Sequence, residues 1–144
     1  MGVGLDHELH YDSAGVGVGT WAEIKKAQDV TLNQTHQETA VNDRSSDDEE
    51  YLIGQKVRSI DFQMTYNNAA AAYEALRDAF NNKTDIGIAC MDGPIATSGS
   101  EGLQANMKVT QFTRNEPVNG VVTASVTLKP SAASSVRPAW VEVV

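Results

Sequence analysis

The residues of this chain best suited to chemistry lie close to its N-terminus. His7 and His10 stand three positions apart, with Asp6, Glu8 and Asp12 around them. Imidazole and carboxylate groups are common zinc ligands, but a zinc site also needs a rigid element that holds its ligands in place. Glycine-rich sequence surrounds this cluster, so we expect no metal site here.

A second group of candidate ligands is the acidic run Asp47, Asp48, Glu49 and Glu50. Consecutive carboxylates attract calcium, yet the spacing is not that of an EF-hand loop, whose ligands alternate along twelve residues. A continuous acidic run is more typical of a solvated surface. We expect no calcium site in this segment.

Nucleophiles and phosphate-binding loops are also weakly represented. Cys90 is the single cysteine and lies in the apolar run IGIACM, which favours a buried small hydrophobe and excludes a disulfide within the chain. The GVGVG sequence at 15–19 lacks the lysine and hydroxyl of a Walker motif, and no serine occupies a nucleophile elbow. The sequence therefore predicts neither an enzyme nor a bound cofactor.

Composition restricts the function further. The 144 residues suit one domain, and 11 basic against 19 acidic residues give a formal net charge of −8. An acidic surface repels nucleic-acid phosphates, which argues against sequence-specific nucleic-acid binding. No signal sequence and no apolar stretch of membrane-spanning length is present, so we expect a protein made in the cytoplasm without a membrane partner.

The strongest structural pattern runs through the middle of the chain. Apolar and polar residues alternate over 57–66, which predicts a strand with one buried and one wet face. A helix is predicted over 68–82, because its four alanines have high helix propensity and Tyr73, Leu76 and Phe80 form one apolar stripe.

Three more strands are predicted in the C-terminal half, at 85–91, 103–113 and 121–129. The last two alternate cleanly and flank the turn sequence Asn119-Gly120, so we expect them to pair as a hairpin. Phe112 breaks the alternation of its strand, which predicts a β-bulge.

The remaining segments carry weaker patterns. Glycine-rich residues 1–19 are expected to form a flexible arm, and short strands are expected at 20–26 and 29–32. Residues 33–56 form a long polar loop, which we interpret as an extended hairpin or arm that docks on another chain. Residues 131–144 form a C-terminal arm, which either packs on an edge of its own sheet or docks on a neighbouring subunit.

The order of these elements resembles the tail tube proteins, or major tail proteins, of long-tailed bacteriophages. The resemblance covers residues 20–130. It rests on the early strands from Trp21 to Leu32, the polar loop ending at the YLIG sequence 51–54, the strand and helix that follow, and the closing pair of long strands. It implies a mainly β fold with one α-helix, a β-sandwich or barrel whose subunits form hexameric rings.

The resemblance also implies partners and a location. Rings of such proteins stack into a hollow tube in the virion tail, assembled in the host cytoplasm, through which DNA is ejected without sequence-specific binding. The expected partners are further copies of the chain, the tape measure protein, the tail terminator and the tail tip. Two alternatives stay open: the tube of a contractile tail or type VI-like secretion machine, and a small soluble ligand-binding β-sandwich.

Two sets of candidate functional residues follow. The acidic run beside an apolar triplet suits an interface core bordered by polar residues, and a C-terminal tryptophan followed by a short β-prone end suits a docking strand. The expected inter-subunit contacts are Asp47, Asp48, Glu49, Glu50, Tyr51, Leu52, Ile53 and Trp140. The polar strand faces are expected to line the lumen, where uncharged or acidic side chains let DNA slide. These lumen-facing residues are Ser59, Asp61, Gln63, Thr65, Gln104, Asn106, Thr123, Ser125 and Thr127.

Overall fold

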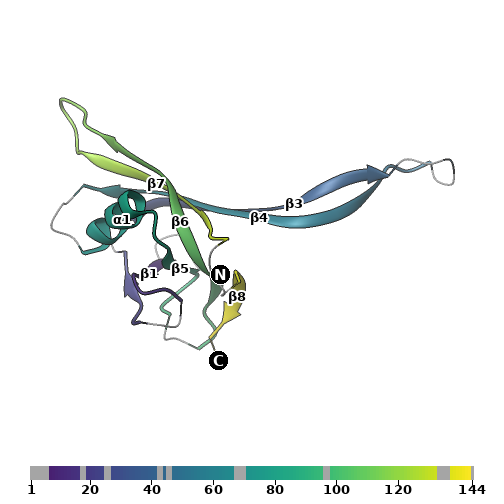
Figure 1. Ribbon diagram of the computed structural model, residues 1–144, viewed down its shortest axis with the longest axis horizontal. Coiled ribbons are helices and arrows are strands. Elements are labelled where there is room, and N and C mark those ends of the chain that lie inside the picture. The colour runs from purple at the N-terminus through teal and green to yellow at the C-terminus, as the bar shows by residue number, and fades with distance from the viewer. Residues whose placement is uncertain are drawn as a thin grey trace.

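A computed structural model describes residues 7–16, 19–24, 27–41, 44, 47–66, 71–95, 98–132 and 137–143. These residues form a mainly β fold with one helix, as the sequence predicts (Figure 1). In chain order the elements are β1 (Glu8–Asp12), β2 (Ala22–Glu23), β3 (Ala27–Val41), β4 (Glu50–Thr65), α1 (Ala71–Asn82), β5 (Ile86–Met91), β6 (Glu101–Asn115), β7 (Thr123–Pro130) and β8 (Ala139–Glu142).

The strands form one continuous antiparallel sheet in the order β2-β1-β5-β6-β7-β4-β3, with β8 paired to β6 off this path. The first half of β6 pairs with β5 and β8, whereas its second half pairs with β7. This long strand therefore joins two half-sheets. The two ends of the path, β2 and β3, do not pair with each other, so the sheet is open and the predicted alternative of a closed barrel is wrong.

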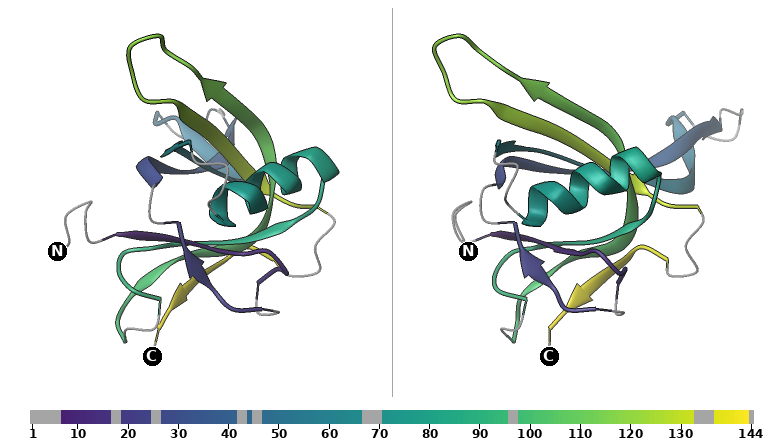
Figure 2. Two further views of the ribbon diagram at one scale, coloured as in Figure 1. Left: turned by 90° about the vertical axis from the view of Figure 1, so that its left-hand side faces the viewer. Right: turned by 60° about the vertical axis from the view of Figure 1, so that its left-hand side comes forward.

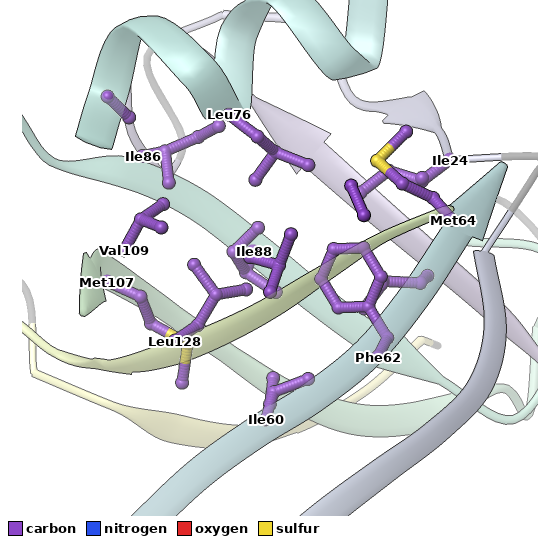
Figure 3. Packing of buried hydrophobic residues seen from close by; sticks show 14 of the residues in the cluster. Ile24, Ile60, Phe62, Met64, Leu76, Ile86, Ile88, Met107, Val109 and Leu128 are labelled. Atoms are coloured by element: carbon purple, nitrogen blue, oxygen red, sulfur yellow. The ribbon is translucent and has the colours of Figure 1, made fainter. Parts of the chain in front are cut away.

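A single hydrophobic core lies between the two half-sheets and α1 (Figure 3). Strands β1, β4, β5, β6 and β7 contribute apolar residues that are excluded from water. Fully or almost fully buried members include Ile60, Phe62, Met64, Leu76, Ile86, Ile88, Leu103, Ala105, Met107, Ala124, Val126 and Leu128. The alternation predicted for β4, β7 and β6 up to Val109 is confirmed, because wet residues lie between these core residues. Strand β5 is buried on both faces, with Ala89 and Met91 as buried as Ile86 and Ile88.

Helix α1 packs against β6 and β5 (Figure 2). Tyr73 and Leu76 are buried, as predicted, and Tyr73 contacts the Phe112 ring edge-on with 5.6 Å between the ring centroids. Phe80 also contacts Phe112, at 6.1 Å, but is partly exposed at the rim. The helix ends before Lys83, which has a left-handed φ of 57°. The first predicted helical residues, 68–70, lie outside the described residues.

The predicted bulge in the penultimate long strand is confirmed. The register between β6 and β7 shifts between Val109 and Gln111, so one extra residue is inserted into β6. The shift reverses the alternation of β6 beyond this point. Phe112 therefore points towards the helix and the core instead of towards water.

The N-terminal segment differs from its prediction. Residues 8–12 form β1, which pairs with both β2 and β5 and places Leu9 in the core, so a flexible arm over 1–19 is wrong for this stretch. Its glycine-rich flanks obscure a short strand that only tertiary pairing stabilises. The carboxylate of Asp12 accepts the backbone N–H groups of Ala14 at 3.0 Å and Gly19 at 2.9 Å. Residues 1–6 and 17–18 lie outside the described residues.

The strands expected at 20–26 and 29–32 have other bounds in the structure. The first is reduced to the two residues of β2, followed by the buried Ile24, with 25–26 outside the described residues. The second is part of β3, which begins at Ala27 and contains a bulge at Asp29, a non-glycine residue with a φ of 51°. An aspartate tolerates this left-handed conformation better than most residues.

Residues 33–56 do not form a structureless loop. Residues 33–41 belong to β3 and 50–56 to β4, and the two strands pair along almost their whole length as an extended hairpin that projects from the body (Figure 1). The interpretation as an extended hairpin is thus confirmed. Fifteen residues of β3, at roughly 3.3 Å each, span roughly 50 Å. The segment has almost no buried side chains beyond the body, so its strand pairing is what orders it.

The C-terminal segment packs on its own sheet. In β8, Trp140 pairs with Leu103 and Val141 with Gly102, and the Val143 N–H donates to the carbonyl oxygen of Ser100 at 2.8 Å. The alternative in which this tail waits for a neighbouring subunit is therefore wrong for 139–142. Residues 133–136 and 144 lie outside the described residues.

Deleting residues 131–144 should destabilise the isolated subunit. The deletion removes the strand pairing of β8 with β6, and each lost hydrogen bond costs about 0.5–1.5 kcal/mol. We expect the free energy of unfolding, measured by urea denaturation, to fall by about 2–4 kcal/mol. Trp140→Ala is the control, because it keeps the strand and removes one half-exposed side chain. An unchanged denaturation curve for the deletion would show that β8 contributes nothing to the domain.

Candidate assembly surfaces

In the histidine and carboxylate cluster near the N-terminus, His10, Glu8 and Asp12 make contacts within the fold. His10 Nε2 lies 3.4 Å from Glu8 Oε2, and the Asp12 carboxylate holds the turn that follows β1. Asp6 lies outside the described residues. Among the described residues, no group of three or more histidine, cysteine or acidic side chains is arranged to hold a metal ion.

Burial affects the ionisation of His10. It is 5% exposed, and its Nδ1 atom has no hydrogen-bond partner. Burial lowers the pKa of His10 below its ordinary value, and the nearby carboxylates of Glu8 and Glu23 partly oppose this shift by favouring the imidazolium. The folded protein therefore prefers the neutral imidazole.

Acidification should destabilise the fold through His10. The pKa of His10 is lower in the folded than in the unfolded chain. The contribution of its neutral imidazole to the free energy of unfolding is therefore fully present above about pH 6.5, and it is lost as the pH falls towards the folded pKa. One proton gives a slope of at most about 1.4 kcal/mol per pH unit. Urea denaturation from pH 8 to 5 should show a smaller decline for His10→Asn than for the wild type. Parallel curves would exclude a contribution from His10.

Cys90 does not have the features of a reactive thiol. It is half-buried against the core, and burial raises the pKa of its thiol. At neutral pH the protonated form prevails, and the protonated thiol is a poor nucleophile. This agrees with the interpretation of Cys90 as a small hydrophobic residue.

A wet face with almost no charge extends across four strands, and we call it the polar ladder. In register, Asp61 lies opposite Thr127, Gln63 opposite Ser125, and Thr65 opposite Thr123. The ladder continues onto β3 on one side and onto the second half of β6 on the other. Its members are Gln28, Thr31, Asn33, Ser59, Asp61, Gln63, Thr65, Gln111, Thr113, Asn115, Thr123, Ser125 and Thr127.

The carboxylate of Asp61 is the one charged group within the polar ladder, and its neighbours bind it. The Thr127 hydroxyl donates to Asp61 Oδ1 at 2.6 Å, and Asn33 Nδ2 donates to Oδ2 at 3.0 Å. Lys108 and Lys129, which pair with each other, follow at the end of this face. The Lys108 ammonium lies 3.1 Å from Asp85 Oδ1.

The structure brings together seven of the nine residues expected to line a lumen: the four on β4 and the three on β7. Gln104 and Asn106 lie instead on the first half of β6, in the other half-sheet. Asn106 Oδ1 accepts the backbone N–H of Val16 at 2.7 Å, so it holds the turn after β1. These two residues therefore do not share the wet face of the polar ladder, contrary to the expectation. Alternation along β6 could not reveal that the strand passes between half-sheets.

The half-sheet that carries the polar ladder has two unpaired edges. Among the described residues, β3 pairs with β4 alone, and β6 beyond Met107 pairs with β7 alone. Unpaired N–H and C=O groups on such edges readily accept a strand from another chain. The geometry thus permits this half-sheet to continue from one copy of the chain to the next.

The residues expected at an interface are divided between two places. Tyr51, Leu52 and Ile53 lie on the projecting part of the β3–β4 hairpin and are 46%, 65% and 61% exposed. The acidic residues 47–50 precede them and are exposed as well. Trp140 lies on β8 in the body, 50% exposed and away from the projecting end of the hairpin (Figure 1). Large apolar side chains exposed together commonly mark an interaction site.

A groove of about 910 Å³ lies where the open sheet fails to close, between β1 and β2 on one side and β3 on the other; we call it the seam groove. Its apolar wall includes Leu9, Ile24, Val30, Leu32, Met91 and Trp140. Its carboxylates are Glu8, Glu23, Asp29, Asp92 and Glu101. Sequence reasoning missed this groove, because one wall is β1, which was expected to be unfolded.

Comparison with solved structures identifies the fold. A chain from the tail of an empty gene transfer agent particle, refined with C6 symmetry, superposes with a TM-score of 0.78 at 16% identity, and the match covers 100% of both chains. The chain has the tail tube fold. The subunit of the SPP1 tail tube shares this tail tube fold with a TM-score of 0.76 at 14% identity, over 90% of this chain and 75% of that one.

The chain is also similar, with a lower TM-score, to a chain from a contractile machine. A chain of a sheath–tube complex from an extracellular contractile injection system matches with a TM-score of 0.59 at 13% identity, over 99% of this chain and 93% of that one. Neither a protein-family model nor a curated protein sequence matches this chain. No described helix is long and apolar enough to cross a membrane.

Proposed function

We propose that this chain is the structural subunit of a tail tube, in which six copies form a ring and rings stack into a hollow conduit for DNA. The observation that carries the proposal is the polar ladder on a half-sheet with two unpaired edges. A sheet that faces water on one side and ends in unpaired edges suits a ring of copies around a hydrated bore. The likeness to a tail refined with C6 symmetry supports six copies.

In this ring, the edge of β3 in one copy pairs with the second half of β6 in the next. The half-sheets then form a continuous wall, with the hydrophobic core and α1 outside and the polar ladder inside. Backbone pairing gives affinity that depends little on side chains. This arrangement would satisfy the unpaired backbone groups of every copy, because a closed ring has no free edge.

The chemistry of the polar ladder suits passage of a polyanion. Each cation that contacts a phosphate releases counterions and strengthens binding, so a bore lined with lysine and arginine would retain DNA. Hydroxyl and amide groups, with the single carboxylate of Asp61, provide a hydrated surface of slightly negative charge. DNA would then move through the tube without sequence-specific contacts.

The projecting hairpin would carry contacts between copies, with Tyr51, Leu52 and Ile53 as apolar anchors beside the acidic residues 47–50. Trp140 would contribute from the body. Partners of the complete tube would include a tape measure protein, a tail terminator and a tail tip, and the location would be a virion tail assembled in the host cytoplasm. No enzymatic activity is part of this function.

Two competing functions have specific observations behind them. The match to a contractile sheath–tube complex favours the tube of a contractile machine, although its TM-score of 0.59 is lower than the 0.78 of the gene transfer agent tail. The seam groove, at about 910 Å³, is large enough for a small ligand and favours a soluble binding domain.

Electron microscopy of the concentrated wild-type protein tests the proposal. We expect rings with sixfold symmetry or long hollow tubes, with the polar ladder of β4 and β7 facing the bore in a density map. A protein that stays monomeric under all assembly conditions would contradict the function. A tube with these side chains on its outer wall would contradict the lumen assignment alone.

A further inference from the structure

The described part of the β3–β4 hairpin carries basic side chains that form no ion pair with a described residue. His36 pairs in register with Lys56, and Gln34 with Arg58, so the side chains of these residues share one face. Together with Thr35 they line a shallow hollow of about 270 Å³ on the hairpin. We call His36, Lys56 and Arg58 the cationic strip.

The two permanent cations of this strip have unused donors. Lys56 and Arg58 form no ion pair with any described residue. The ion pairs of the described residues involve other basic side chains. Arg58 Nε is shielded from solvent and has no hydrogen-bond partner. A guanidinium in this condition has a strong preference for a carboxylate, which accepts two of its N–H groups at once.

The seam groove offers the complementary chemistry. Among its described lining residues there are five carboxylates and no lysine or arginine. Glu8 is paired with His10, and Asp92 Oδ1 accepts the backbone N–H of Glu101 at 2.8 Å. Among the described residues, Glu23 and Glu101 form no ion pair, and both are exposed. Lys25 and Lys26 follow Ile24 in the sequence, and the carboxylates outnumber these two cations as well.

We propose that the seam groove of one copy receives the cationic strip of the hairpin of a second copy. This inference rests on the proposed tube function and adds the receptor that the projecting hairpin would occupy. The apolar wall of the groove would cover Ile53, which is 61% exposed on the free hairpin. The groove carboxylates would pair with Lys56 and Arg58.

Both halves of the contact are incomplete in a single chain. The groove exists because β2 and β3 do not pair, and the hairpin has no core of its own. One copy therefore has an open acidic seam, and another has an exposed basic and apolar ribbon. A contact between unlike surfaces is heterologous, and such contacts generate rings or open filaments when repeated. This is the geometry that a tube requires.

Photo-crosslinking tests the contact directly. A photoreactive p-benzoylphenylalanine replaces Gln34, which lies beside the cationic strip. This substitution keeps both cations, Lys56 and Arg58. Illumination of a mixture of isotope-labelled and unlabelled chains, followed by mass spectrometry, should join the hairpin of one copy to groove peptides around Glu23, Met91 or Glu101 of another. Crosslinks to other surfaces, or none between copies, would overturn the inference.

Charge exchange provides a second test. Lys56→Glu with Arg58→Glu should raise the critical concentration for assembly at least tenfold. Glu23→Lys with Glu101→Lys should raise it by a similar factor. All four changes together should restore assembly, because the pairing is re-formed with reversed signs. A matched control combines the hairpin pair with Glu74→Lys and Glu116→Lys, exposed residues outside the groove. Both quadruple variants keep the net charge of −8, so net charge alone cannot explain a difference.

The outcomes separate this inference from the proposed function. Equal recovery by both quadruple variants, or recovery by neither, would overturn the groove contact while tubes of the wild type upheld the function. Crosslinks into the groove in a protein that forms no tubes would uphold the contact and contradict the function. Circular dichroism of each variant verifies that the subunit is folded.

Discussion

Replacing Leu52 and Ile53 together by serine should leave a folded subunit that does not form tubes. Both side chains are more than half exposed on the projecting hairpin and touch no core residue, so their loss costs the isolated subunit little stability. In an assembly they would be buried, and each would contribute about 1.5–3 kcal/mol. Losing both at each of many equivalent contacts should raise the critical concentration beyond a hundredfold.

Light scattering and electron microscopy measure this effect, and thermal unfolding of the monomer shows that the fold is intact. Val118→Ser with Val121→Ser is the matched control. Val118 and Val121 are 98% and 66% exposed between β6 and β7, so this double change removes a comparable apolar surface outside the proposed contacts. Tubes of normal length from the Leu52 and Ile53 double variant would exclude the hairpin anchors from assembly.

Replacing Gly102 by alanine should destabilise the subunit by about 3 kcal/mol or more, because overpacking of this kind forces the backbone to move. Gly102 lies in β6 with β5 on one side and β8 on the other, opposite Met91 and Val141. A Cβ atom at this position would collide with the carbonyl oxygen of Cys90. The neighbour is backbone in a paired strand, so it cannot rotate away.

Urea denaturation and soluble yield measure the loss. Gly54→Ala is the control, because its new Cβ would approach Gln37 O no closer than 3.3 Å in the exposed hairpin. We expect this control to change the stability by less than about 1 kcal/mol, since surface changes usually remain within that range. A Gly102→Ala variant as stable as the control would mean that β5 and β6 do not approach as closely as described.

These two predictions concern different parts of the molecule. The body has a packed core with buried strands, and its stability depends on close contacts such as that of Gly102. The hairpin depends on pairing between its own two strands, and its side chains remain available for a partner. Stability and assembly should therefore respond to separate sets of substitutions, which makes the proposed function testable with folded variants.

The sequence by itself determined the elements whose information is local. Alternation in β4 and β7 identifies Ile60, Phe62, Val126 and Leu128 as core residues, because a strand with one wet face repeats every two residues. The apolar stripe of α1 is equally local, as is the bulge signalled by Phe112. These patterns also sufficed to indicate the tail tube fold.

The tertiary structure alone decided the elements that depend on distant partners. Strand β1 is stable because β5 pairs with it, and β8 because β6 offers a free edge, although neither has a strong pattern of its own. The passage of β6 between half-sheets separates Asn106 from the polar ladder, and the unpaired ends of the sheet create the seam groove. Pairing between segments remote in the chain is not encoded in the periodicity of either segment, so these features follow only from the folded arrangement.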